Sequence, residues 1–200
     1  MSEKDAPQNS PKEFLTFCGV LGLGRLVIEG KENAVELLRR AASDERWRIR
    51  EAVKKALQII GKHDLGQLFI IGKDWINGNM YEQRAILTSI CREEFLRDPS
   101  YARETFHLLE KAMNSIAGAK ASTREYKLLK KALGYYWSSA ILACPEQGKP
   151  MFEHWLLSND PNIRWILKKA LKDKQLIKKE SHWVARCRHK IINVQDELLK

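Results

Sequence analysis

The sequence contains one short motif three times, at intervals that constrain the fold. Lys-Lys-Ala-Leu begins at Lys54, at Lys130 and at Lys168, and a weaker relative that ends at Thr88 lies between the first two copies. From Lys54 through Thr88 and Lys130 to Lys168 the spacings are 34, 42 and 38 residues. Intervals of this size are typical of arrays of helical hairpins, in which each repeat covers the apolar face of its neighbour. The sequence therefore predicts stacked pairs of helices.

The spacing of apolar residues around these copies predicts helices rather than strands. Between Trp47 and Ile60 the apolar side chains recur every three or four residues, as on one face of a helix. No segment alternates apolar and polar residues over a sustained length. We therefore predict an all-α fold of about four hairpins, with the second helix of each in an inner layer. The expected pairs are 31–42 with 47–60, 65–76 with 80–95, 101–116 with 124–143, and 150–157 with 163–172, with end helices over 12–29 and from Trp183.

The length and composition favour one domain. A chain of 200 residues with 44% apolar content can bury one sizeable core or one continuous solenoid. We predict a single domain over residues 12–200 after a disordered leader over residues 1–11, which contains Pro7 and Pro11 and little to bury. The small residues of segment 118–122 are expected to form the most flexible interior point.

The cysteines and the longest apolar stretch bear on the compartment. The four cysteines lie far apart with no Cys-x-x-Cys pair, which favours isolated core thiols in a reducing compartment. They are Cys18, Cys91, Cys144 and Cys187. The stretch from Phe14 to Ile28 is broken by Arg25 and three glycines, so neither a membrane span nor a secretion leader is expected. We predict a cytoplasmic protein.

The charge is strongly positive and unevenly distributed. Thirty-five Lys and Arg residues against 25 Asp and Glu residues give a formal net charge of +10. Ten basic and two acidic residues lie between Arg164 and Lys190, so the C-terminal part is the electrostatic pole. This balance favours an acidic partner, either a protein surface or a nucleic acid.

Basic residues on the second helices of the hairpins are the first candidate binding site. Stacked repeats would align them as a ladder that could follow phosphates. The candidates are Arg50, Lys54, Arg84, Lys130, Arg164, Lys168 and Lys172. In the alternative interpretation, the arginines pair with aspartates at the turns and the lysines are merely solvated.

Three of the six tryptophans carry specific expectations. Trp165 follows Arg164 at the edge of an apolar face, where an aromatic ring could stack on a base or anchor a peptide, and buried packing is the alternative. Trp47 and Trp137 stand among apolar or helix-forming neighbours and are expected in the core.

Two segments resemble a known repeat. The segment from Asp44 to Gly61 resembles the second half of a HEAT repeat, and the segment from Asp160 to Leu171 is similar to another. The resemblance implies a right-handed α-α superhelix. It also implies that an Asp and an Arg near each turn join adjacent repeats, a role that falls to Asp44 with Arg50 and to Asp160 with Arg164. The whole chain also resembles bacterial HEAT-repeat proteins of this size that have no assigned activity, through 17–19, 46–51 and 133–138.

A more distant resemblance is to the HEAT-like DNA alkylation repair glycosylases. Those proteins hold duplex DNA on a basic concave face and use tryptophans and an Asp to stabilise the departing base. This chain lacks a Trp-Asp-x-x-Asp signature, and Asp74 beside Trp75 is the nearest fragment, so Asp74 is the one catalytic candidate. A DNA-binding protein related to this family is therefore the alternative to a binding scaffold.

Other chemistry finds little support in the sequence. Gly19, Gly22 and Gly24 follow no strand, so close helix packing or a local break in the helix is expected rather than a phosphate loop. The grouping of His182, Cys187 and His189 does not match a metal-ligand spacing, and no Gly-x-Ser-x-Gly motif is present. We expect no metal or cofactor, and a non-catalytic scaffold that binds an acidic macromolecule. The oligomeric state is not indicated.

Overall fold

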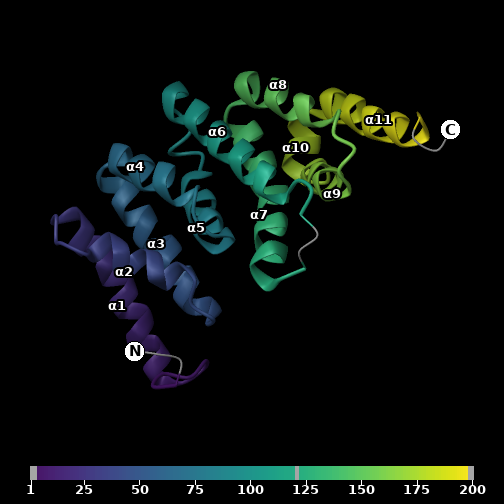
Figure 1. Ribbon diagram of the computed structural model, residues 1–200. Coiled ribbons are helices and arrows are strands. Elements are labelled where there is room, and N and C mark those ends of the chain that lie inside the picture. The colour runs from purple at the N-terminus through teal and green to yellow at the C-terminus, as the bar shows by residue number, and fades with distance from the viewer. Residues whose placement is uncertain (1–3, 120–121, 198–200) are drawn as a thin grey trace. The chain divides into compact units, whose positions relative to one another are not determined.

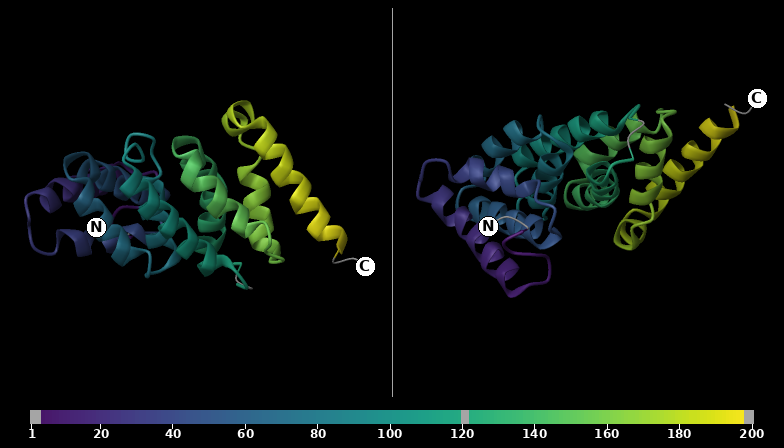
Figure 2. Two further views of the ribbon diagram at one scale, coloured as in Figure 1. Left: turned by 90° about the horizontal axis from the view of Figure 1, so that it is seen from above. Right: turned by 60° about the horizontal axis from the view of Figure 1, so that its bottom comes forward.

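The computed structural model describes residues 4–119 and 122–197, with side chains as far as Ile191, and every regular element in these ranges is a helix (Figure 1). Figure 2, which shows the chain from two further sides, likewise contains only coiled ribbons there. The helices are α1 (Pro11–Ile28), α2 (Ala34–Ala42), α3 (Trp47–His63), α4 (Leu65–Trp75), α5 (Met80–Ile90), α6 (Pro99–Ile116), α7 (Arg124–Ala143), α8 (Pro145–Trp155), α9 (Pro161–Ala170), α10 (Lys174–Lys179) and α11 (Ser181–Glu197). The all-α prediction is confirmed for these residues.

The chain divides into two compact units, residues 1–90 and 91–200. In the first unit α3 packs against both α1 and α5, while α2 and α4 cover these helices. In the second unit α7 is central and packs against α6, α8, α9 and α10, and α11 packs against α9 and α10. The prediction of one domain over residues 12–200 stays a prediction.

The three copies of the repeated motif occupy equivalent positions on their helices. In each copy the Ala and Leu are buried, whereas the two preceding lysines are half-buried or exposed. The buried pairs are Ala56 and Leu57 in α3, Ala132 and Leu133 in α7, and Ala170 with Leu171 at the end of α9. Each copy of the motif thus places its Ala and Leu on the buried face of its helix, as the helical period predicts.

The three glycines of α1 lie within one uninterrupted helix. Gly24 is buried against α3, where an added Cβ would lie 2.9 Å from the carbonyl oxygen of Ala56. Gly19 and Gly22 are exposed and have open space beside them. The expectation of close helix packing is confirmed at Gly24.

Several helix boundaries differ from the sequence prediction. Helix α8 begins at Pro145 rather than Pro150, because proline is well accommodated in the first turn of a helix, and Pro150 lies inside it. Helix α3 continues through Gly61 to His63, and α5 ends at Ile90 rather than Phe95. The short helix α10 was not predicted at all.

The segment before α1 packs against α3. Ala6 is fully buried, and its carbonyl oxygen accepts a hydrogen bond of 2.8 Å from the guanidinium of Arg46. The Ser10 side chain then accepts from the N–H of Glu13 and caps α1. The prediction of a disordered leader over residues 1–11 stays a prediction, and residues 1–3 lie outside the described part of the chain, as do Lys120 and Ala121 of the link expected to be flexible.

Aromatic rings form a continuous core in the second unit. The Trp137 ring centroid lies 6.0 Å from that of Phe106 and 5.6 Å from that of Phe152, which in turn lies 5.5 Å from that of Trp183. Trp137 is fully buried, as predicted. This core joins α6, α7, α8 and α11 and fixes the frame on which α9 rests.

Candidate anion-binding surface

Helices α7 and α9 approach closely and run in the same direction. Gly134 of α7 permits the approach, because a Cβ there would lie 2.6 Å from Cγ of Lys169. Further toward the start of both helices, Lys130 of α7 donates a hydrogen bond of 2.9 Å to the side-chain oxygen of Asn162 of α9. The two helices therefore present their side chains in matched register along one seam.

Asp160 fixes the start of α9. Its carboxylate accepts from the backbone N–H groups of Asn162 at 2.7 Å and Ile163 at 3.1 Å, and from that of Gly118 at 2.6 Å. Burial raises the pKa of Asp160, but hydrogen bonds from Gly118, Ile163 and Asn162 outweigh burial and hold the pKa below its usual value. The helix start and the Asn162 side chain that contacts Lys130 are thereby anchored.

Two aromatic rings flank the seam, each with a lysine from the opposite helix. Lys130 Nζ of α7 lies 5.1 Å from the ring centroid of Trp165 in α9. Lys169 Nζ of α9 lies 4.8 Å from the ring centroid of Tyr135 in α7. Both distances are within the range of cation–π interaction. Trp165 is 43% exposed and Tyr135 is 45% exposed, so both rings remain accessible.

A hollow of about 300 Å³ lies beside Tyr135, where α7 meets the end of α9 and the start of α10. Its lining includes three ammonium groups, those of Lys169, Lys172 and Lys174. The one carboxylate in its lining is that of Asp173, which accepts from backbone N–H groups of Gln175 and Leu176 at the start of α10. The hollow thus has a net positive lining.

A second hollow of about 340 Å³ lies on the other side of Lys172, between α9 and α11. Lys168 and Arg188 bring further positive charge to it, and Leu171 and Ile191 form its apolar floor. Lys172 lines both hollows. We refer to Lys130, Tyr135, Trp165, Lys168, Lys169, Lys172 and Lys174 together as the seam surface.

The seam surface includes four of the residues that the sequence singled out, Lys130, Trp165, Lys168 and Lys172. Sequence reasoning missed Tyr135, Lys169 and Lys174. Lys169 was available as the second lysine of the third repeated motif, but nothing in the sequence shows that it crosses to a ring on another helix.

Arg164, also on α9, has a different environment. Its guanidinium donates to the backbone carbonyl oxygen of Ile191, so it joins α9 to α11. This contact fits the alternative in which the arginines have structural partners, although the partner is a carbonyl rather than an aspartate.

The remaining predicted binding residues, Arg50, Lys54 and Arg84, belong to the first unit. Arg50 is buried and donates to the carbonyl oxygens of Asp44 and Glu45, with a separation of 2.8 Å to the latter. Lys54 forms an ion pair with Glu51 of the preceding turn. Arg84 is half-buried on α5. None of the three contributes to the two hollows described above.

Asp74, the catalytic candidate, takes part in an ion-pair cluster. Arg39 of α2 lies 2.8 Å from Asp74 at the end of α4 and 2.8 Å from Glu82 of α5. The hydrogen bond to Glu82, acting against burial, raises the pKa of Arg39 above its usual value. Trp75 is fully buried, so it offers no exposed aromatic wall beside Asp74. The cluster joins three helices of the first unit.

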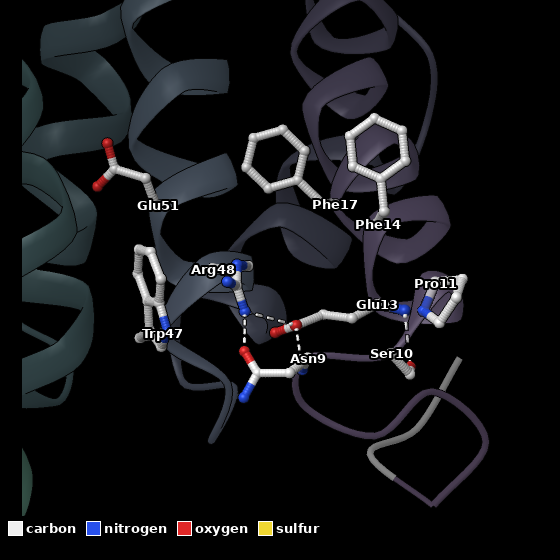
Figure 3. A pocket seen from close by; sticks show the side chains of 9 residues that line it. All are labelled: Asn9, Ser10, Pro11, Glu13, Phe14, Phe17, Trp47, Arg48 and Glu51. Atoms are coloured by element: carbon white, nitrogen blue, oxygen red, sulfur yellow. Dashed lines mark hydrogen bonds and ion pairs between the residues drawn. The ribbon is translucent and has the colours of Figure 1, made fainter.

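The first unit has an aromatic pocket that the sequence did not predict (Figure 3). It encloses about 530 Å³, with Phe14 and Phe17 of α1 on one side and Trp47 of α3 on the other. The prediction that Trp47 lies in the core is wrong, because it is 49% exposed. Arg48 joins the two helices through an ion pair of 3.1 Å with Glu13.

The described residues lack both a metal-binding cluster and a membrane-spanning helix. They contain no group of three or more His, Cys, Asp or Glu side chains that could hold a metal ion. None of the helices described is both long and apolar enough to cross a membrane. Comparison of the chain with protein-family models, with curated proteins and with solved structures found no match.

Proposed function

We propose that this protein is a non-catalytic, HEAT-like binding scaffold that recognises an acidic macromolecule through the seam surface of its second unit. The observation that carries the proposal is the gathering of four lysines around two adjoining hollows where α9 meets α7, α10 and α11, with Lys130 further along the same seam. The four are Lys168, Lys169, Lys172 and Lys174. Lysines that line a concave surface give it a positive potential, and an anionic partner gains from several of them at once.

Two features support the repeat architecture, a right-handed α-α superhelix of helical hairpins. The pair α3 and α5 in the first unit and the pair α7 and α9 in the second are each packed as successive second helices of hairpins would be. The repeated motif has the same buried phase in α3, α7 and α9. Both features suit a chain in which each repeat contacts mainly its neighbours.

The test is a charge-reversal experiment with a matched control. Three seam lysines are replaced in the variant Lys168→Glu, Lys172→Glu, Lys174→Glu. The control variant Lys31→Glu, Lys55→Glu, Lys62→Glu makes the same change in net charge at three exposed lysines of the first unit. Binding of fluorescent polyanions, an oligonucleotide and an acidic peptide, is measured by anisotropy over a salt series.

We expect the wild type to bind at least one polyanion, and the seam variant to lose most of that binding while the control retains it. If a nucleic acid is bound, the slope of log affinity against log salt decreases by about one for each phosphate-contacting lysine removed. Equal losses in both variants would mean that only net charge matters, and would refute the seam surface as the site. If neither polyanion binds at low salt, the proposal as a whole is refuted.

A further inference from the structure

The seam surface has a feature that positive charge alone does not require, namely two exposed aromatic rings. Trp165 and Tyr135 are large and apolar, yet 43% and 45% of their surfaces remain exposed. The carboxylates of an acidic peptide would pair with the lysines but gain nothing from the rings. Nucleic-acid bases, by contrast, stack on aromatic side chains whatever their sequence, because every base has a π-face.

Each ring has a cation nearby from the neighbouring helix. Lys130 Nζ lies 5.1 Å from the Trp165 ring centroid, and Lys169 Nζ lies 4.8 Å from that of Tyr135. Lys130 is further held by its hydrogen bond to Asn162. Each ammonium lies over one face of its ring, so a base would stack on the opposite face, with its phosphate toward the lysines of the seam surface.

Stacking on these two rings favours single strands over duplexes. The two ring–lysine pairs lie at different heights along the helices. On α9 they are four residues apart, from Trp165 to Lys169, and on α7 they are five residues apart, from Lys130 to Tyr135. At 1.5 Å per residue this offset is about 6–8 Å along the helix axes. It corresponds to about two base steps of 3.4 Å. A base that stacks on either ring must offer a free π-face, which the unstacked bases of a single strand do and the bases of an intact duplex, stacked on each other, do not.

Positive charge continues along the surface beyond Tyr135. The hollow beside this ring is lined by Lys169, Lys172 and Lys174, and Lys172 also lines the next hollow, with Lys168 and Arg188. A strand with one base on Tyr135 would have its following phosphates within this lysine-lined region. Rings followed by a basic groove are the usual combination in proteins that bind single strands without sequence preference.

We propose that the seam surface binds single-stranded nucleic acid, with bases stacked on Trp165 and Tyr135 and phosphates held by Lys169, Lys172 and Lys174. This inference rests on the proposed function and names the partner that its surface selects.

The test compares four fluorescent probes of similar length on the wild-type protein. They are an oligothymidylate of about 12 nucleotides, within the roughly 4–16 nucleotides of known single-strand sites, an abasic strand with the same number of phosphates, the corresponding duplex, and an oligoglutamate. The double variant Trp165→Leu, Tyr135→Leu removes both rings. Trp47→Leu, which removes a tryptophan of similar exposure from the first unit, is the control.

We expect the wild type to bind oligothymidylate more tightly than the abasic strand and the duplex. Stacking on one ring corresponds to about 5-fold to 100-fold in affinity. The double variant should lose the preference for oligothymidylate over the abasic strand but keep its salt slope, because the lysines remain. Trp47→Leu should behave as wild type. A circular dichroism melt, together with Trp165→Phe and Tyr135→Phe, which retain a ring, separates loss of stacking from loss of folding.

The outcomes separate this inference from the function on which it rests. If oligoglutamate binds as tightly as oligothymidylate, or if the abasic strand or the duplex binds equally well, the single-strand inference is overturned and the acidic-partner function stands. If the double variant, which lacks both rings, binds oligothymidylate as tightly as the wild type does, stacking on these rings is overturned. If no probe binds at low salt, both proposals fail.

Discussion

Gly24 of α1 lies against the backbone of Ala56 of α3, so closely that an added Cβ would be 2.9 Å from the Ala56 carbonyl oxygen and 3.0 Å from its Cα. A backbone neighbour cannot rotate away as the end of a side chain can. We therefore predict that Gly24→Ala destabilises the protein by about 1–3 kcal/mol through overpacking. This loss exceeds the gain of up to about 1 kcal/mol that alanine brings to a helix interior. Urea unfolding followed by circular dichroism measures the difference.

Gly19→Ala is the matched control for this prediction. Gly19 lies in the same helix, with no atom within 4 Å of the position of an added Cβ. Here only the helix propensity changes, so the free energy of unfolding should rise by roughly 0.5–1 kcal/mol. If both substitutions change the free energy of unfolding in the same direction, the close α1–α3 contact is contradicted.

The four cysteines should differ in reactivity. Cys18 is exposed, whereas Cys91 and Cys187 are buried, so the expectation that all four are core thiols is wrong for Cys18. Burial raises the pKa of Cys91 well above its usual value and, with the nearby Glu153 carboxylate, raises the pKa of Cys187 to about 12. Because the thiolate is the reactive form, we predict that exposed Cys18 is the fastest-reacting thiol in the native protein at pH 8, ahead of half-buried Cys144.

A thiol-reactive chromophore measures this directly. Native protein should show one rapid reaction that the variant Cys18→Ser lacks, with Cys91 and Cys187 reacting only as the protein opens. In denaturant all four should react together. Rapid native reaction of Cys187 would contradict its position in the second unit.

The sequence predicted the helices better than the surface that they form. In α3 and α9 the apolar residues recur at helical spacing, and burial of one face decides the structure, so the pattern in one segment is sufficient. The start of α8 depends instead on Pro145 in its first turn, and the start of α10 depends on the Asp173 cap. Neither boundary can be located from the apolar spacing of these short polar segments.

The exposure of Trp47 could have been predicted from its neighbours in the sequence. Trp47 lies four residues before Glu51 and seven before Lys54, so all three share one helix face, and the two charged residues mark that face as solvent-accessible. The ring–lysine pairs could not be predicted in the same way. The contact between Tyr135 and Lys169 depends on how α7 and α9 align, and Gly134 with the packing beneath it sets that alignment. No local sequence pattern predicts such an alignment.

The Asp160 cap of α9 should make the free energy of unfolding depend on pH. Hydrogen bonds hold the pKa of Asp160 below its usual value, so the ionised form stabilises the folded state. This contribution is present above the unfolded pKa of about 3.9 and is lost as the pH falls through the lower folded value. Asp160→Ala should cost about 1 kcal/mol at neutral pH. Asp160→Asn keeps a capping oxygen but not the charge.

Unfolding free energies at neutral pH and below about pH 4 separate the two effects. The difference between wild type and Asp160→Asn should shrink as the pH falls, because the wild-type carboxylate becomes neutral. A difference that does not change with pH would show that the charge has no role at this cap.

Arg50 provides the sharpest test between a basic ladder and a structural role for the arginines. It is 6% exposed, its guanidinium donates to the carbonyl oxygens of Asp44 and Glu45, and it lies 5.1 Å from the ring centroid of Tyr81. Arg50→Met keeps an apolar chain but leaves those carbonyls without this donor, which costs about 1–3 kcal/mol. We predict this loss of stability with no change in polyanion affinity beyond about twofold, since a buried group gains little from an outside phosphate.

Lys172→Met is the complementary variant. Lys172 is exposed and lines both hollows of the seam surface, so its removal should change stability by less than about 0.5 kcal/mol. It should weaken polyanion binding and, for a nucleic acid, lower the salt slope by about one. The same anisotropy and unfolding assays on both variants therefore give opposite patterns if the arginine is structural and the lysine binds the partner. If Arg50→Met instead weakens binding as much as Lys172→Met while the protein remains folded, Arg50 is a binding residue and its structural assignment is wrong.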